Sequence, residues 1–312
     1  MTFAPHIFSV KDPPRHWRNY LENEGFVVLC DILDTSEQAD LLDTFKREFT
    51  TVSPNFNFSN PDTWTIANTP AMFGKGMSVY NGFGQADFMW KLRTHTNVQK
   101  PFKTLFCTDD LVTSLDGFSI FVSDKQKSKS WLHIDENPDN ELYSIQASYN
   151  MFPVQAGDAG FVVVPKSHKT FTPKPKNKAD WIVVDQDTFQ PEAVKLLIPG
   201  NCLTIWNSRL VHANTGMTKI NKNRNKKEIP ERINRFTPYI TFLPKSLRTE
   251  KVKDKRIQAY KDGKATSHWS NKCEIKTYPY GFKKLYESRG FNTLKPTMTH
   301  DGKIPQDRLK LL

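Results

Sequence analysis

A histidine and an aspartate stand two residues apart in the stretch WLHIDENPDN, at residues 131–140. Successive side chains of a β-strand point to opposite faces, so His133 and Asp135 would share one face, roughly 6.6 Å apart at a rise of about 3.3 Å per residue. Two side chains in this position could hold one metal ion. A surface strand end, where both side chains face water, explains the pattern equally well, and His-x-Asp alone does not decide between them.

A metal ion held by two histidines and one carboxylate needs a third ligand from a distant strand. Such a facial triad leaves three coordination positions of Fe(II) open for other molecules. The candidate histidines are His95, His168, His212 and His268. His212 is favoured because it follows the predicted strand GNCLTIWNSRLV, far enough along the chain to return beside His133. The others come too soon after Asp135 or lie outside the predicted β-rich part, and we interpret them as loop, surface or packing residues.

Short β-strand patterns separated by turn residues fill the chain from about residue 117 to 245. They are GFSIFVS, SWLHID, YSIQASYNMF, GFVVVP, AVKLLIP, NCLTIW and RFTPYITFLP. Many short strands at this spacing predict a sandwich or barrel of antiparallel strands.

Helical patterns occupy the two ends of the chain. Residues 35–49 open with a capping-box pattern from Thr35 to Gln38 and carry apolar residues at helical spacing. The other predicted elements are helices at 15–24, at roughly 86–106 and from 245 to about 262, and a short buried strand at 25–30. We therefore expect one domain over residues 1–312, made of a mixed helical part (1–115), a β core (116–245) with a basic insertion (218–231), and a C-terminal helical and irregular appendage (246–312).

Length and composition indicate a protein with a sizeable core, because 38% of the 312 residues are hydrophobic and 12% are aromatic. The four cysteines are Cys30, Cys107, Cys202 and Cys273. They are far apart and form no C-x-x-C pair, so neither a disulfide framework nor a zinc ribbon is indicated and a reducing compartment is expected. No apolar run approaches the ~20 residues that span a bilayer, and the start of the chain lacks a signal-peptide pattern. We expect a soluble, cytoplasmic protein without a membrane partner.

The formal net charge of +11 is concentrated in three lysine-rich stretches. They are KQKSK (125–129), PKSHKTFTPKPKNK (165–178) and TKINKNRNKK (218–227). Basic loops could attract a small acidic metabolite or dock a nucleic acid. The run KNRNKK contains no aromatic residue on which bases could stack, so a small-molecule substrate is favoured over nucleic acid.

Several motifs in a fixed order resemble a known family. After His-x-Asp come YNMFPVQAGDAGFVVVPKSHK (149–169), IPGNCLTIWNSRLVHAN (198–214) and RFTPYITFLPK (235–245). The N-terminal motif is YLENEGFVVLCDILDTSEQADLL (20–42). Together they resemble the phytanoyl-CoA dioxygenase-like branch of the Fe(II)/2-oxoglutarate oxygenases, over about residues 15–245. The resemblance implies a mainly β fold with flanking helices, namely the cupin-like double-stranded β-helix or jelly roll.

The resemblance also implies roles for single residues. His133, Asp135 and His212 would hold Fe(II), and an arginine would bind the far carboxylate of 2-oxoglutarate, since its planar fork matches a carboxylate. Arg232 and Arg235 are the two candidates. Strand alternation points Arg235 into the barrel with Thr237, Tyr239 and Thr241, while Phe236, Ile240 and Phe242 pack under helices, so Arg235 is favoured. Pro238 within this strand indicates a bulge or an edge.

Gln146 and Ser148 lie on a strand that lines the cofactor pocket in this family. An ordinary polar residue inside a strand is an equally good explanation for both.

The implied activity is a dioxygenase reaction that uses O2 and converts 2-oxoglutarate to succinate while an organic substrate is oxidised. Related halogenases carry a small residue in place of the carboxylate ligand, so Asp135 favours hydroxylation. Two alternatives remain open at this stage. One is an oxygenase that modifies a nucleic acid or protein docked on the basic loops, and the other is a jelly-roll binding module without catalysis.

Overall fold

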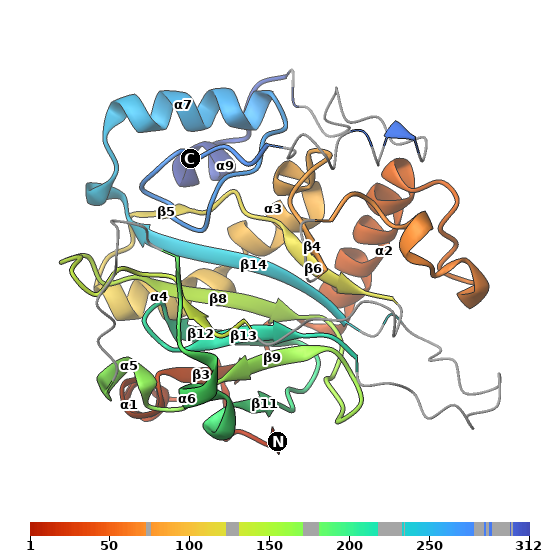
Figure 1. Cartoon of the computed structure of the whole chain (residues 1–312). Coiled ribbons are helices and arrows are strands. Elements are labelled where there is room, and N and C mark those ends of the chain that lie inside the picture. The colour runs from red at the N-terminus through yellow and green to blue at the C-terminus, as the bar shows by residue number, and fades with distance from the viewer. Residues whose placement is uncertain are drawn as a thin grey trace.

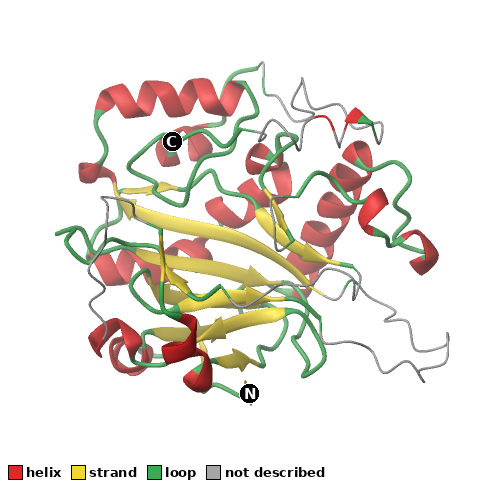
Figure 2. Cartoon of the chain, viewed as in Figure 1, coloured by secondary structure: helices red, strands yellow, loops and turns green. Residues whose placement is uncertain are grey.

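The computed structural model describes residues 1–72, 76–122, 131–170, 181–217, 233, 235–277, 284, 287–288, 300 and 302–312. Two β-sheets form the centre of the molecule, and helices cover one face of the larger sheet (Figure 1). Figure 2 separates strands, in yellow, from helices, in red. The described residues contain no helix that is both long and apolar enough to cross a membrane.

The larger sheet has eight strands in the order β2-β3-β12-β8-β14-β6-β4, with β5 paired to β14. Their bounds are β2 (Ile7–Ser9), β3 (Phe26–Cys30), β12 (Cys202–Asn207), β8 (Ile145–Asn150), β14 (Arg235–Pro244), β6 (Phe118–Phe121), β4 (Met77–Ser78) and β5 (Leu111–Thr113). The smaller sheet has six strands in the order β1-β11-β9-β13-β7-β10. Their bounds are β1 (Thr2–Phe3), β11 (Val194–Leu196), β9 (Gly160–Val163), β13 (His212–Thr215), β7 (His133–Ile134) and β10 (Ile182–Val183).

Helices fill the two ends of the chain, as the sequence patterns predict. The described α-helices are α1 (Pro14–Glu24), α2 (Thr35–Val52), α3 (Asp87–Thr94), α4 (Thr96–Phe106), α5 (Ser167–Thr170), α6 (Gln186–Phe189), α7 (Glu250–Lys261) and α9 (Gln306–Leu311). The predicted helix at 86–106 is wrong as one piece, because His95 takes an extended backbone and its side chain caps α4. The capping box of α2 is also one residue earlier than predicted, between Asp34 and Glu37.

The main hydrophobic core lies between the larger sheet and the helices α2, α3 and α4. Strand alternation sends Phe236, Ile240 and Phe242 of β14 into this core, as predicted from the sequence. Phe236 stacks on Phe45 of α2, with 3.7 Å between the ring centroids. This contact fixes β14, and therefore the side chains on its opposite face.

The space between the two sheets has an apolar half and a polar half. Strands β3, β12, β9 and β11 contribute a second hydrophobic cluster that includes Phe26, Phe161 and Trp206. Beside it, β8 and β14 turn buried polar side chains inward, among them Gln146, Ser148 and Arg235. A polar interior is expensive unless its groups are paired or bind a ligand, so this half is where a site is expected.

The C-terminal segment packs against the β core. Arg256 of α7 is fully buried and donates to the backbone carbonyls of Leu312, Lys272 and Thr113. Burial lowers the pKa of this guanidinium to about 10. These bonds connect the helical tail to β5 without using any predicted site residue.

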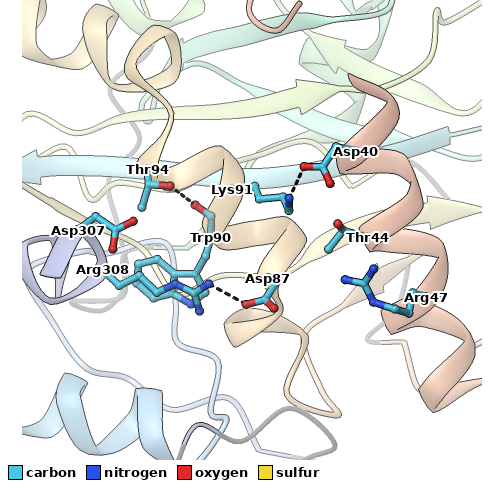
Figure 3. Close-up of a pocket in the computed structure, with 9 residues that line it drawn as sticks. All are labelled: Asp40, Thr44, Arg47, Asp87, Trp90, Lys91, Thr94, Asp307 and Arg308. Carbon is cyan, nitrogen blue, oxygen red and sulfur yellow. Dashed lines mark hydrogen bonds and ion pairs between the residues drawn. The ribbon is translucent and has the colours of Figure 1, made fainter. Parts of the chain in front are cut away.

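A shallow cavity of about 390 Å³ lies between α2, α3 and α9 (Figure 3). Its lining is charged, and several of these charges are paired within the protein. Lys91 contacts Asp40, and Arg308 donates to Asp87 over 2.7 Å. A ligand that bound these charges would have to break the existing ion pairs, so this cavity is a weak candidate for a binding site.

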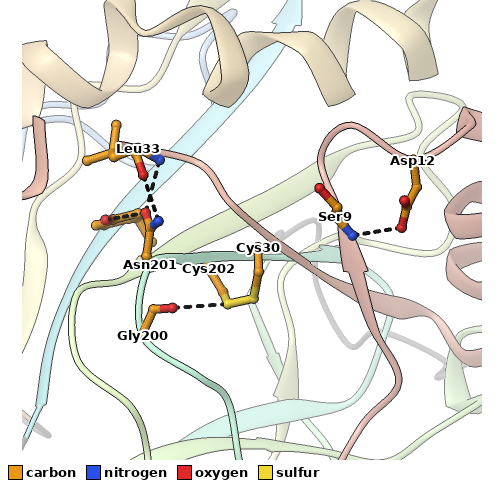
Figure 4. Close-up of a disulfide and its surroundings, with 8 residues drawn as sticks. Ser9, Asp12, Cys30, Leu33, Gly200, Asn201 and Cys202 are labelled. Carbon is orange, nitrogen blue, oxygen red and sulfur yellow. Dashed lines mark hydrogen bonds between the residues drawn. A yellow bond between two sulfur atoms is a disulfide. The ribbon is translucent and has the colours of Figure 1, made fainter. Parts of the chain in front are cut away.

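Cys30 and Cys202 form a disulfide between the neighbouring strands β3 and β12 (Figure 4). The prediction of no disulfide is therefore wrong for this pair, which is separated by 172 residues in the sequence. Antiparallel pairing of Leu29 with Leu203 brings the two cysteines together. Next to the bond, Asn201 accepts hydrogen bonds from the backbone of Leu33 and from the hydroxyl of Tyr149.

Candidate metal centre

His133, Asp135 and His212 form one buried group, although the sequence separates the aspartate and the second histidine by 77 residues. His133 of β7 and His212 of β13 are directly opposite each other in an antiparallel pair, so both point to the same face. One ligand atom from each of the three side chains lies within 4.8 Å of the others. Only 5% of each imidazole and 13% of the carboxylate side chain are exposed. The three residues singled out in the sequence therefore lie together, and their role as metal ligands stays a prediction.

The strand that carries His212 differs from the prediction. GNCLTIWNSRLV is not one strand, because β12 ends at Asn207 and a turn separates it from β13, which begins at His212. Asn207 stabilises this turn by accepting from the backbone of Arg209 and Leu210. The turn moves the chain from the larger sheet to the smaller one, and His212 thereby arrives beside His133.

Backbone carbonyls orient both imidazoles. Nδ1 of His133 lies 3.0 Å from the carbonyl oxygen of Trp131, and Nδ1 of His212 lies 2.7 Å from that of Leu210. A carbonyl can only accept, so Nδ1 must carry the proton in each ring. The lone pair of a neutral imidazole is then on Nε2, the atom that faces Asp135, and such a backbone partner is typical of metal-binding histidines.

The three side chains need a cation between them. Nε2 of His133 lies 3.5 Å from Oδ1 of Asp135, and Nε2 of His212 lies 3.2 Å from Oδ2. With neutral imidazoles these are contacts between lone pairs, which a metal ion or an added proton must bridge. When an added proton bridges these contacts, burial still disfavours the carboxylate, but the charge of His133 and the hydrogen bond from His212 outweigh it and hold the pKa of Asp135 well below its ordinary value.

The backbone and carboxylate of Asp135 are held from several sides. Its amide donates to the carbonyl of Ser208 over 2.8 Å, and its carbonyl accepts from Nε2 of His268 over 3.2 Å. Gln146 of β8 donates to Oδ2 over 3.0 Å and also to the hydroxyl of Ser208. The sequence favours a surface or packing role for His268, but in the structure His268 reaches the loop of the candidate metal ligands, which nothing in the local sequence indicates.

The next residue, Glu136, is a buried carboxylate that anchors the same loop. It has no exposed area and accepts from the backbone of Ser144 over 3.1 Å and from Arg209 over 3.2 Å. Arg209 also donates to the carbonyl of Asn140. Arg209 is therefore the ion-pair partner of Glu136.

Arg235 is the first residue of β14 and points into the polar half of the interior. It is 2% exposed, and its Nε donates to the hydroxyl of Thr237 over 3.0 Å. Its Nη1 has no hydrogen-bond partner among the described residues. Burial lowers the pKa of this guanidinium, and Tyr239 only partly opposes the shift. The competing residue, Arg232, lies outside the described residues.

Other buried polar atoms, on β12 and β13, also lack partners. Within the described part of the chain they are Oγ1 of Thr204, Nε1 of Trp206 and Oδ1 of Asn214. Tyr239 lies among them, since its hydroxyl contacts the amide of Asn214 at 2.6 Å and the hydroxyl of Ser119 at 2.7 Å. Each unpaired buried group costs about 1–3 kcal/mol, so a set of them indicates space for a polar ligand.

The two weaker candidates from the sequence differ in their surroundings. Gln146 contacts the candidate metal ligand Asp135, as described above. Ser148 is paired in register with Thr204 on one side and Tyr239 on the other, so it belongs to the wall of the polar interior. Pro238 lies just beyond the ladder of β14 with β8, which covers Tyr239–Thr241, so this strand tolerates it without a lost hydrogen bond there.

The remaining histidines have other roles. His95 caps α4 and contacts Glu37, while His168 contacts the carbonyl of Glu22 at the end of α1. The stretches 125–129 and 218–227 lie outside the described residues, as do 171–178 of the third basic stretch.

Comparisons with known proteins concern the fold of the chain. No protein-family model matches the chain. Ava biosynthesis cluster protein O from Aspergillus versicolor is 27% identical over 167 residues, which is 53% of this chain and 54% of that protein. The chain thus spans about half the length of this curated relative.

Two solved structures share the arrangement of most of the chain. The non-heme alpha ketoglutarate-dependent carbocyclase SnoK from nogalamycin biosynthesis has a TM-score of 0.52 and 12% identity, covering 77% of this chain and 87% of its own. The epimerase SnoN, solved with Fe3+, alpha ketoglutarate and nogalamycin RO, has a TM-score of 0.51 and 15% identity, covering 74% and 83%. The chain has the fold of these enzymes. The finer resemblance to the phytanoyl-CoA dioxygenase-like branch stays a prediction.

Proposed function

We propose that this chain is an Fe(II)- and 2-oxoglutarate-dependent oxygenase of the jelly-roll type that oxidises a small organic molecule. One observation carries the proposal. In the fold that this chain shares with SnoK and SnoN, its two histidines and one aspartate form one group, and the polar interior also holds Arg235, whose Nη1 has no partner among the described residues. Two neutral imidazoles and a carboxylate suit Fe(II) and leave coordination positions open for other molecules.

The donor set fits a divalent ion. His133 and His212 would each use Nε2, since a backbone carbonyl fixes the proton on Nδ1. Asp135 would supply a carboxylate oxygen, and the positive ion itself would favour the ionised form of this group. The role of the protein is to hold these three groups on one side of the ion, with Gln146 and His268 restraining Asp135 from two directions.

The polar interior fits 2-oxoglutarate as a cosubstrate. Arg235 would bind the distal carboxylate, because its Nη1 has no partner within the described part of the chain and a guanidinium forms paired hydrogen bonds to a carboxylate. Ser148 and Tyr239 lie in register beside each other and would complete this end of the pocket with hydroxyl groups. Burial of Arg235 strengthens such an ion pair, since water does not screen it.

Fe(II) with 2-oxoglutarate and O2 supplies an oxidant for a C–H bond of the substrate, with release of succinate and CO2. The protein contributes orientation and exclusion of water, because His133 and His212 are 95% covered and rings of Trp206 and Phe161 pack around His212. Asp135 occupies the position where related halogenases have a small residue, so we propose hydroxylation as the outcome.

The names of similar proteins support a small-molecule substrate. The curated relative is named for a biosynthesis cluster, and SnoK and SnoN belong to nogalamycin biosynthesis. A substrate docked on the basic stretches remains the second candidate. A jelly roll without catalysis is disfavoured, because it has no need for two histidines and a carboxylate gathered in one group.

The test is turnover of 2-oxoglutarate to succinate by the purified chain with Fe(II) and O2. Pools of small organic molecules and, separately, RNA, DNA and protein would be added to find which of them stimulates succinate formation. Stimulation by a small-molecule pool that disappears in His212→Ala supports the proposal. Absence of any Fe(II)- and 2-oxoglutarate-dependent succinate across all pools contradicts it.

A further inference from the structure

Two half-exposed apolar side chains lie at the edge of the smaller sheet, next to the candidate metal centre. Strand β10 is the last strand of this sheet, and its Val183 is directly opposite His133. Alternation therefore places Val183 and Trp181 on the same face as His133, and Ile182 on the other face, where it packs into a core cluster. Trp181 is 51% exposed and Val183 is 50% exposed.

Trp181 lies against the histidine that would bind the metal. Its ring centroid is 5.8 Å from that of His133, with 45° between the planes. Trp131 covers another side of the same imidazole, with centroids 4.4 Å apart and only 17° between the planes. Trp131 is fixed because its Nε1 donates to the carbonyl of Asn214 over 2.8 Å. The aromatic surface therefore begins at His133, the candidate metal ligand, and continues outward to the half-exposed indole of Trp181.

An uncovered indole is an unusual feature beside a buried polar site. Trp is highly buried on average, so a half-exposed indole in contact with a candidate metal ligand is a candidate binding surface. The interior beyond the metal, toward Arg235, is polar and suits 2-oxoglutarate. A second molecule would therefore reach the metal from the side of β10, past Trp181 and Val183.

We infer that Trp181 is the platform on which an aromatic ring of the substrate stacks, so that the substrate is a small molecule with at least one such ring. This inference rests on the proposed function. An indole offers a flat face that favours offset or tilted contact with another ring. Trp131, Trp181 and Val183 carry no charge, so this wall selects for apolar, flat surface, and the ring would be held beside His133 with a neighbouring C–H bond directed at the metal.

The test uses a matched pair of probes, 2-naphthoate and its saturated counterpart decahydro-2-naphthoate, which have the same charge and carbon skeleton. The protein would first be loaded with Mn(II), in place of Fe(II), and with 2-oxoglutarate, and each probe would then be titrated by calorimetry. The variants are Trp181→Ala and Trp181→Phe. Phe3→Ala is the matched control, since Phe3 is a 39% exposed aromatic on β1, at the opposite edge of the same sheet.

We expect the wild-type protein to prefer the naphthoate, and Trp181→Ala to weaken its binding about tenfold and remove the preference. Trp181→Phe should retain most of the preference, and Phe3→Ala all of it. Binding of neither probe, equal binding of both by the wild type, or unchanged naphthoate affinity in Trp181→Ala would overturn the inference. So would tighter binding of a single-stranded oligonucleotide that Trp181→Ala abolishes. Failure of the wild type to take up Mn(II) and 2-oxoglutarate at the loading step would instead contradict the proposed function itself.

Discussion

Gln146 donates its side-chain amide to Oδ2 of Asp135 over 3.0 Å, and this bond links the larger sheet to the candidate metal ligand. The carboxylate oxygen that contacts His212 is the one that receives it. Gln146 thus restrains the carboxylate in the orientation that a metal ion would need.

Replacement of Gln146 by leucine should weaken metal binding without abolishing it. Residues that orient a ligand typically contribute a factor of about 10 to 100 in metal affinity, and leucine keeps the volume while removing the donor. The measurement is a titration with Mn(II). Thr241→Val, at the buried position paired in register with Gln146, is the control and should leave the affinity unchanged. Equal affinity in Gln146→Leu and the wild type would show that the bond does not position Asp135.

Arg235→Lys should weaken binding of 2-oxoglutarate by about tenfold or more while leaving the metal bound. Lysine keeps the charge but loses the planar fork, and the pocket is buried and cannot supply water in its place. Binding would be measured by calorimetry on the Mn(II)-loaded protein. Arg232→Lys is the control. If the Arg232 variant is impaired and the Arg235 variant is normal, the anchor has been assigned to the wrong residue.

Arg209→Ala should destabilise the protein by about 3–5 kcal/mol, because it leaves the fully buried carboxylate of Glu136 without its guanidinium. Unfolding by denaturant would give the free energy. The ion pair of Lys253 with Glu250 provides a contrast, since both side chains are exposed to solvent, and Lys253→Ala should produce no measurable change. Similar stabilities of the two variants would mean that Glu136 is adequately held by its other contacts.

Removal of the disulfide through Cys30→Ser should lower the free energy of unfolding by about 2–4 kcal/mol, as is typical for the loss of a native disulfide. Cys107→Ser, at an exposed free cysteine, is the control. Alkylation of the unfolded, unreduced protein should modify only Cys107 and Cys273. Modification of all four cysteines before reduction would contradict the pairing.

The sequence indicated the sheet-rich core and the candidate metal ligands for a clear physical reason. Period-two alternation in RFTPYITFLP separates the inward Arg235 from Phe236, and the structure follows this pattern. His-x-Asp and a distant histidine also needed only strand geometry to be brought together.

What the sequence did not indicate depends on contacts between distant segments. Cys30 and Cys202 meet only through the pairing of β3 with β12, and His268 reaches Asp135 only because the C-terminal segment folds back on the core. No local sequence pattern pointed to Trp181 as a binding residue. Its proposed role depends on the edge strand β10 lying beside His133. Such relationships follow from topology, which local patterns do not contain.

The most direct test of the account is the metal content of the purified protein after equilibration with Fe(II) under anaerobic conditions. Elemental analysis should find one iron per chain in the wild type, and a loss of that iron in each of His133→Ala, Asp135→Ala and His212→Ala. The three side chains share one ion, so each replacement removes a third of its protein ligands. Iron content that is unchanged in all three variants would contradict the assignment of this group as the metal centre.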